Sequence, residues 1–206
     1  GDLDAETPNL KGFELNSEQA SYIKAILPNC RDEAAIDQLV RSLETARGVL
    51  PVATDGTMAP AAFELFRKSA VGYQEQAEAT RDGKLTYRDF QSDLRSSVAE
   101  LKSSLQPVMQ GLSGREPTLG EVALSTEAAA FLRNALTQNL RSEMSLQNLT
   151  RAVEIFGKAH DGKLEGEAFA QFQTMVTDYK ANWPDRSFFD FNKLERIASY
   201  TVKAKT

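Results

Sequence analysis

Asp161-Gly162-Lys163-Leu164, with Phe169 following, is a pattern that this chain contains three times. An apolar residue lies two positions after each Gly, and a Phe lies seven positions after it. Gly permits the positive φ of a sharp turn, and the Phe falls early in a following helix. The pattern therefore predicts a repeated helix-loop-helix unit. The other two copies are Asp55-Gly56 with Met58 and Phe63, and Asp82-Gly83 with Leu85 and Phe90.

This spacing resembles the EF-hand family, whose twelve-residue loop has Gly at position six, an aliphatic residue at position eight and Phe just after position twelve. The resemblance covers three short windows of the chain. It implies an all-α fold of EF-hand-like helix-loop-helix pairs, in which the aliphatic residues of two loops pair. It also implies that each Phe anchors the outgoing helix in the core.

Two of the three loops lack the oxygen ligands that the resemblance implies. Asp161 is the carboxylate at position five of the third loop, and the first loop is no richer in carboxylates. We expect both loops to be empty. Positions one, three and twelve are Pro51, Ala53 and Ala62 in the first loop, and Gly157, Ala159 and Ala168 in the third.

The second loop is the candidate ion site. Because its last ligand is Asp rather than the longer Glu, it favours one-oxygen coordination, and hence Mg²⁺ or weakly bound Ca²⁺. The preferred interpretation, however, is a hydrogen-bonded turn that holds no ion, so that no cofactor is expected and bound Ca²⁺ or Mg²⁺ is the alternative. The candidate ligands are the side chains of Glu78, Thr80, Asp82, Thr86 and Asp89 and the carbonyl of Lys84.

Composition indicates a folded protein without a nucleic-acid partner. The chain has 206 residues, 41% of them hydrophobic, which suffices for one large or two small cores. Its net charge of −5 and the absence of a basic stripe argue against binding to phosphate backbones. The single cysteine, Cys30, cannot form an internal disulfide.

No apolar run is long enough to form a transmembrane segment, so we expect a soluble protein. The N-terminus has no signal-peptide pattern and begins with Gly1. That start fits either a cytoplasmic protein or an exported one whose signal has been removed, and it leaves the compartment open.

The two halves of the sequence resemble each other. Leu124-Ser125-Thr126 lies 109 positions after Leu15-Asn16-Ser17, and each opens a helical pattern. A fourth, decayed loop is expected around residues 184–187. We therefore predict two duplicated lobes, 1–105 and 121–206. The Gly- and Pro-containing residues 106–120 are predicted to connect them.

Helix ends follow from local signals. Asn16 or Ser17 is expected to cap the first helix, and Gly48 to close the second in the left-handed conformation. Pro60 is placed in the first turn of the next helix. Since only 27 residues separate Gly56 from Gly83, either one continuous helix or two short ones fill that interval. The helix after the second loop is expected to end before Pro107.

No catalytic motif is present. His160 is the only histidine, and no phosphate loop or zinc pattern occurs. We therefore expect no enzyme. The aromatic cluster of Trp183, Phe188, Phe189 and Phe191 is interpreted as core, with a binding anchor as the alternative.

The sequence thus predicts a non-catalytic protein-protein interaction module with an amphipathic helix as partner. The alternative function is a weak Ca²⁺ or Mg²⁺ sensor or buffer working through residues 78–89. The pattern does not indicate an oligomeric state.

Overall fold

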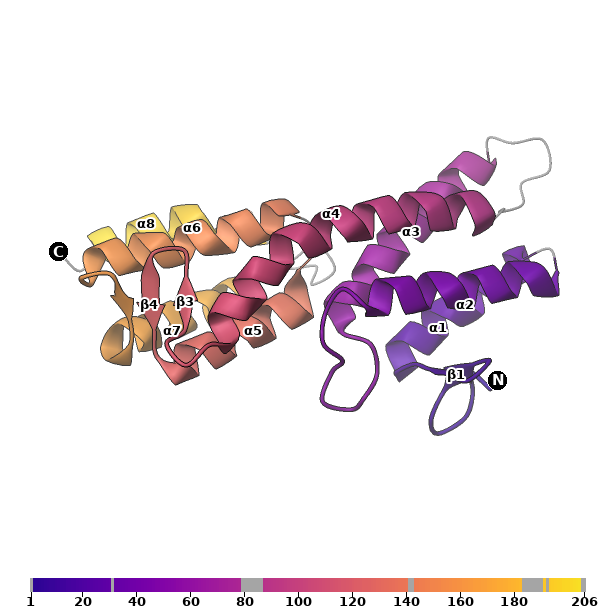
Figure 1. The fold of residues 1–206 in the computed structure, drawn as a ribbon, viewed down its shortest axis with the longest axis horizontal. Helices are drawn as coiled ribbons and strands as arrows, with labels where there is room; N and C mark the ends of the chain where they lie inside the picture. The colour runs from indigo at the N-terminus through magenta and orange to yellow at the C-terminus, as the bar shows by residue number, and fades with distance from the viewer. Residues whose placement is uncertain are drawn as a thin grey trace. The chain divides into compact units, whose positions relative to one another are not determined.

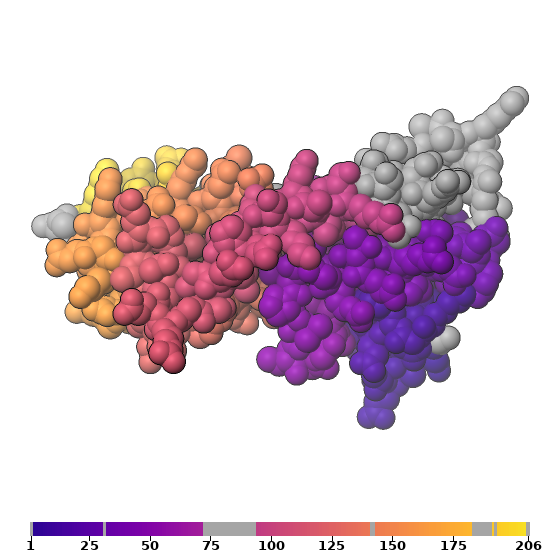
Figure 2. Space-filling view, viewed as in Figure 1, coloured from indigo at the N-terminus to yellow at the C-terminus, as the bar shows by residue number. Residues whose placement is uncertain are grey.

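The computed structural model describes residues 2–30, 32–78, 87–140, 143–182, 191 and 193–204, without the side chains of 72–93 (Figures 1 and 2). The chain divides into two compact units, Gly1–Lys102 and Ser103–Thr206. The described residues are mostly helical, with two small sheets. The expected helical fold class is confirmed at this level, while the sheets were not predicted.

The first unit begins with a hairpin of β1 (Asn9–Leu10) and β2 (Phe13–Glu14). Four helical segments follow: α1 (Ser17–Ile26), a short 3-10 helix (Leu27–Asn29), α2 (Glu33–Arg47) and α3 (Pro60–Glu78). Asn16 caps α1 in a reciprocal capping box with Gln19, as its side-chain type favours. The interval between Gly56 and Gly83 therefore begins with one long helix, α3, which passes Val71 without a break.

The long helix α4 (Tyr87–Ser113) contains the boundary between the two units (Figure 1). The second unit continues with β3 (Thr118–Leu119), β4 (Val122–Leu124), α5 (Thr126–Asn139) and α6 (Glu143–Ala159). It ends with β5 (Lys163–Leu164), α7 (Gly166–Asn182) and α8 (Leu194–Lys203). The sheet order is β3-β4-β5.

The expected end of the helix before Pro107 is wrong, because α4 includes Pro107 and continues to Ser113. Pro107 removes one backbone donor, but burial favours the longer helix: Leu105 and Leu112 are at most 1% exposed. Arg133 also donates to the Leu112 carbonyl at 2.6 Å, which satisfies an acceptor that the helix end leaves open. Much of the predicted connection 106–120 is thus helix and strand.

Gly48 does not take the left-handed conformation predicted for it. Its φ is −70°, and the chain leaves α2 through a right-handed turn. The two loop glycines do take the predicted conformation, with φ of +82° at Gly56 and +76° at Gly162. In both loops the next helix begins four residues after the Gly, at Pro60 and at Gly166.

Each unit has its own buried core, built along the helix faces that the sequence predicted. Leu39 and Leu43 of α2 are fully buried, as are Leu149, Val153 and Phe156 of α6. Phe66 of α3 and Phe172 of α7 are fully buried as well. Of the predicted C-terminal aromatic cluster, the structure describes only Phe191, which is fully buried and therefore belongs to the core.

The hairpins of the two units have the same register. Leu10 pairs with Phe13, and Leu119 pairs with Val122, at positions 109 residues apart. At the end of each hairpin a backbone N–H donates to a proline carbonyl at 2.9 Å, from Leu15 to Pro8 and from Leu124 to Pro117. These hairpins extend the sequence similarity of the two halves into segments where no repeat was predicted.

Aromatic contacts also recur at related positions. Tyr22 meets Phe63 edge to face with ring centroids 5.8 Å apart, and Phe131 meets Phe169 edge to face at 5.7 Å. In each unit the first ring lies on the helix after the hairpin, and the second is the Phe seven positions after the loop Gly. The Phe therefore anchors the outgoing helix, as the loop pattern indicated.

Candidate functional site

The first loop is closed by its own hydrogen bonds. The Asp55 carboxylate accepts from the Thr57 hydroxyl at 2.7 Å and from the Thr57 N–H at 2.9 Å. The Gly56 N–H donates to the Ala53 carbonyl at 3.0 Å. The one carboxylate at a loop position thus stabilises the turn, and this is the hydrogen-bonded alternative to an ion site.

The hydrogen bonds from Thr57 lead to a prediction about the acid titration of Asp55. The Thr57 hydroxyl and N–H hold the pKa of Asp55 below its ordinary value of 3.8. Because the pKa is lowered in the folded chain, the contribution of the turn to stability is present above the ordinary value and is lost as the pH falls from there through the lower, folded pKa. Thr57→Val should raise the pKa of Asp55, measured by carboxyl ¹³C NMR.

The matched control is Thr45→Val, which removes a hydroxyl that bonds to the Arg41 carbonyl within α2. It should leave the Asp55 titration unchanged. If Asp55 titrates at the same pH in Thr57→Val as in the parent, the Thr57 hydroxyl is not a cause of its lowered pKa.

The third loop is closed by backbone bonds and by strand pairing. The Gly162 N–H donates to the Gly157 carbonyl at 2.7 Å, and Lys163 donates to the His160 carbonyl at 3.1 Å. Leu164 in β5 pairs in parallel with Leu124 in β4. Among the described residues, the third loop thus pairs with the hairpin before α5. The family resemblance implied that it would pair with another loop of the same kind.

The candidate ion loop lies outside the description. Thr80, Asp82, Lys84 and Thr86 are not among the described residues, nor are the side chains of Glu78 and Asp89. Across the residues that the structure does describe, no group of three or more His, Cys, Asp or Glu side chains is placed to hold a metal ion. The ion site at 78–89 stays a prediction.

His160 follows the last residue of α6, in the turn that leads to β5. Its Nδ1 lies 2.8 Å from the Phe156 carbonyl, and its ring stacks on Phe156 with centroids 6.1 Å apart. These contacts give His160 a structural role at the end of α6.

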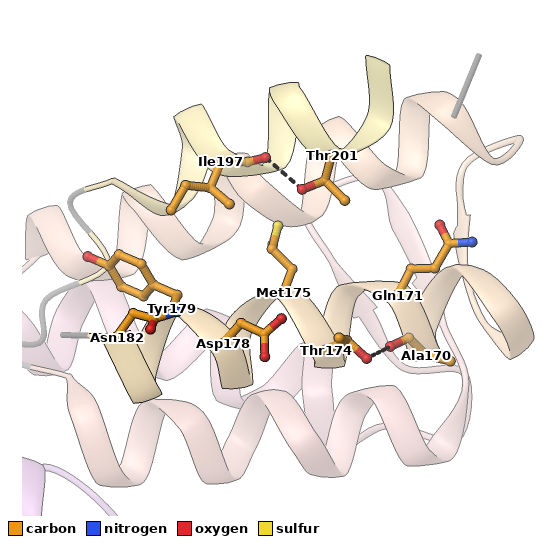
Figure 3. Close-up of a pocket in the computed structure, with 9 residues that line it drawn as sticks. All are labelled: Ala170, Gln171, Thr174, Met175, Asp178, Tyr179, Asn182, Ile197 and Thr201. Atoms are coloured by element: carbon orange, nitrogen blue, oxygen red, sulfur yellow. Dashed lines mark hydrogen bonds between the residues drawn. The ribbon is translucent and has the colours of Figure 1, made fainter. Parts of the chain in front are cut away.

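A groove of about 510 Å³ lies between α7 and α8 (Figure 3). Met175 and Tyr179 form its floor and are each 6% exposed, and Met175 points across the gap toward α8. Ile197 and Thr201 of α8 form the opposite side. The remaining α7 residues of the groove are Ala170, Gln171, Thr174, Asp178 and Asn182.

The spacing of these residues explains the groove. Gln171, Thr174, Asp178 and Asn182 recur at three- and four-residue intervals and lie on one face of α7. Ile197 and Thr201 are one turn apart on α8. The sequence reasoning did not identify α8, although Leu194, Ile197, Ala198, Thr201 and Val202 form an amphipathic pattern that could have found it.

A second, charged crevice of about 730 Å³ lies beside α6, where Gly120 and Glu121 face Arg151, Glu154 and Lys158. Arg151 is 3.6 Å from Glu195 of α8 in an ion pair. Because acidic and basic groups alternate around it, the crevice selects neither an anion nor a cation.

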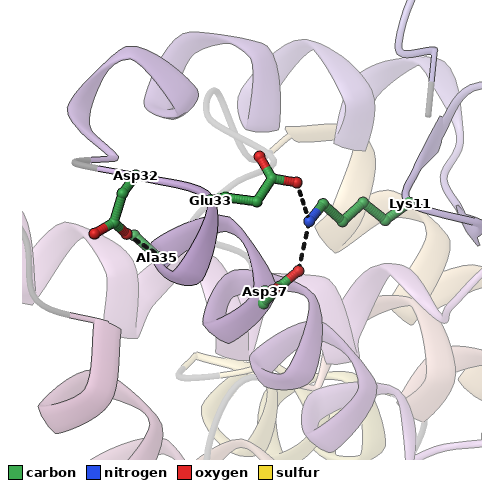
Figure 4. Close-up of polar contacts among 5 residues, drawn as sticks. All are labelled: Lys11, Asp32, Glu33, Ala35 and Asp37. Atoms are coloured by element: carbon green, nitrogen blue, oxygen red, sulfur yellow. Dashed lines mark hydrogen bonds and ion pairs between the residues drawn. The ribbon is translucent and has the colours of Figure 1, made fainter.

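In the first unit a surface cluster joins the hairpin to α2 (Figure 4). Lys11 at the hairpin turn contacts Glu33 and lies 2.6 Å from Asp37. Asp37 first and Glu33 second raise the pKa of Lys11. Asp32 next to them caps α2 by accepting from the Ala35 N–H at 2.9 Å. Each carboxylate of the cluster has a structural partner.

Among the described residues, no helix combines the length and the apolar character needed to cross a bilayer. Comparisons of this chain with protein-family models, with curated proteins and with solved structures give no match.

Proposed function

We propose that this chain is a non-catalytic protein-protein interaction module, built from two duplicated units of EF-hand-like type. In this proposal the groove between α7 and α8 receives an amphipathic helix of a partner protein. The observation that carries the proposal is a groove with a buried apolar floor and a polar rim, lined by two helices.

Duplication is supported by contacts that recur at related positions. The hairpins share their register, and the edge-to-face pair of Tyr22 and Phe63 corresponds to Phe131 and Phe169. Each hairpin also contacts the second long helix that follows it, through Arg47 above the Phe13 ring in the first unit and through Gly157 against Val122 in the second. The shared order of these contacts supports the proposed duplication.

The loops support a binding role without ion control. In the first loop the Asp55 carboxylate is engaged by Thr57, and in the third loop Asp161 is exposed at a φ of +55°. Helix-loop-helix geometry is thus kept in both loops while the ligands are missing. The sensor or buffer alternative depends on residues 78–89 alone.

The groove has the form that a helical partner requires. Its α7 side runs from Ala170 to Asn182, which corresponds to about 18 Å of helix or some three turns. An amphipathic helix presents apolar residues at three- and four-residue intervals over such a length. Burial of a few of these against Met175 and Ile197 would supply the affinity, and the polar rim would set the register.

The test is an NMR titration of the ¹⁵N-labelled chain with model amphipathic helices of about four turns, made of Leu and Ala on one face. Amides of α7 and α8 are expected to shift. Thr174→Trp, which fills the groove from its rim, should weaken binding at least about tenfold, since a blocked groove forfeits most of its buried contact.

Thr177→Trp is the matched control, because Thr177 is exposed on α7 but does not line the groove. It should bind the peptides as the parent does. Shifts confined to other elements, or equal weakening by both Trp variants, would reject the groove as the binding site.

A further inference from the structure

We infer, resting on the proposed function, that the partner helix carries basic residues along the edge that faces α7. The argument concerns the charge of the two lips of the α7–α8 groove. Asp178 lines the groove and is exposed. Glu167 lies one turn before Gln171, another groove residue, and its carboxylate is 3.4 Å from the Gln171 amide.

The charged side chains on this side of α7 are both acidic: Asp178 lines the groove, and Glu167 lies three residues before Ala170, where the groove begins. Between Glu167 and Asp178 the sequence contains no Lys or Arg. Lys180 is the one basic residue of α7. Because it comes two residues after Asp178, it lies on roughly the opposite side of the helix. A helix lying in the groove therefore meets two carboxylates on this side and no compensating cation of α7.

The α8 lip has a different character. Tyr200 is 60% exposed and lies one turn after Ile197 of the groove. The α8 residues that line the groove, Ile197 and Thr201, carry no charge. The charge beside the groove thus lies on the α7 side, and a partner helix with one basic edge has a preferred orientation.

The spacing of the carboxylates makes the inference specific. Glu167 and Asp178 are eleven residues apart, which is about 16 Å along the helix axis. Two Lys or Arg residues about three turns apart on the partner would face both carboxylates at once. Because both carboxylates are exposed, each pair contributes modestly, and together they favour a basic edge by about three- to tenfold in Kd.

The test compares two model peptides of about four turns that share one Leu stripe. One carries Lys along an edge and the other carries Glu at the same positions. Fluorescence anisotropy should give tighter binding of the Lys peptide, with a preference that shrinks as salt is raised. The Glu167→Gln, Asp178→Asn double variant should remove the preference.

The control is Glu121→Gln with Glu154→Gln, which changes the net charge equally but in the separate crevice beside α6. It should keep the preference. Equal binding of both peptides would overturn the inference while leaving the groove as a binding site. Binding of neither peptide would reject the proposed function too. Shifts of α7 and α8 amides caused only by raising the protein concentration would identify a second copy as the occupant.

Discussion

Phe172→Ala is expected to lower the free energy of unfolding of the second unit by about 3–5 kcal/mol, the range for truncating a fully buried aromatic side chain. Phe172 is fully buried on the inner face of α7. Its ring meets Phe156 edge to face at 5.3 Å and lies 6.5 Å from Phe131. Removal of the ring leaves a cavity where three helices meet, which the surrounding side chains can fill only in part.

The measurement is urea unfolding, combined with hydrogen exchange resolved along the chain so that the two units are followed separately. Protection of α5, α6 and α7 should fall, and binding of model helices to the groove should weaken because α7 forms one wall. Gln173→Ala is the control, since Gln173 is the exposed neighbour, and it should change stability by less than about 0.5 kcal/mol. A loss below about 1 kcal/mol in Phe172→Ala would mean that α7 is not anchored by this ring.

Gly157→Ala is expected to destabilise the second unit by about 1–3 kcal/mol, although Ala ordinarily favours a helix over Gly. A Cβ at Gly157 would lie 2.5 Å from Cγ2 of Val122 and 3.1 Å from its Cγ1. No real Cβ contact is that short, so either the hairpin or α6 must move. The change tests whether α6 approaches β4 as closely as described.

Val122→Ala should relieve the clash, so that the double variant is more stable than the sum of the single changes predicts, by about 1 kcal/mol or more in a double-mutant cycle. Gly48→Ala is the control in the first unit. Its Cβ would come no closer than 3.5 Å to the Thr45 carbonyl, and its φ of −70° suits any residue, so it should be neutral or slightly stabilising. Additive behaviour of Gly157→Ala and Val122→Ala would contradict the contact.

The first unit also joins its hairpin to the second long helix that follows it, through other residue types. There the Arg47 guanidinium of α2 lies 4.7 Å from the centre of the Phe13 ring of β2. In the second unit a Gly without a side chain lies against Val122 instead. The Gly157→Ala test therefore concerns the second unit alone.

Several features of the fold could be predicted because they depend on neighbours in the chain. Asn16 caps α1 through Gln19, three residues away, and Pro60 begins α3. The positive φ of Gly56 and of Gly162 follows from the turn each occupies. The buried faces of α2 and α6 follow from helical spacing. The hairpin strands, of two or three residues each, were missed because they are too short to show an alternating pattern.

The candidate groove could not be predicted in the same way. It depends on α8, which lies beside α7 only in the folded unit, and on the exposure that packing leaves to Ile197 and Thr201. The sequence placed the candidate ion-binding chemistry instead at residues 78–89, the one of the three loops with oxygen-bearing side chains at most of its ligand positions. That prediction and the groove concern different parts of the molecule and are tested by different experiments.

The sequence by itself determined the cap of α1 at Asn16, the start of α3 at Pro60 and the turns at Gly56 and Gly162, because each is decided by interactions within a few residues. Only the tertiary structure decided that α4 runs through Pro107, that β5 pairs with β4, and that α7 and α8 enclose a groove. Each of these depends on groups distant in sequence: Leu112 is held by burial and by Arg133, and Leu164 by Leu124. Such contacts override local preference because buried apolar area and satisfied backbone groups outweigh the cost of one missing hydrogen bond.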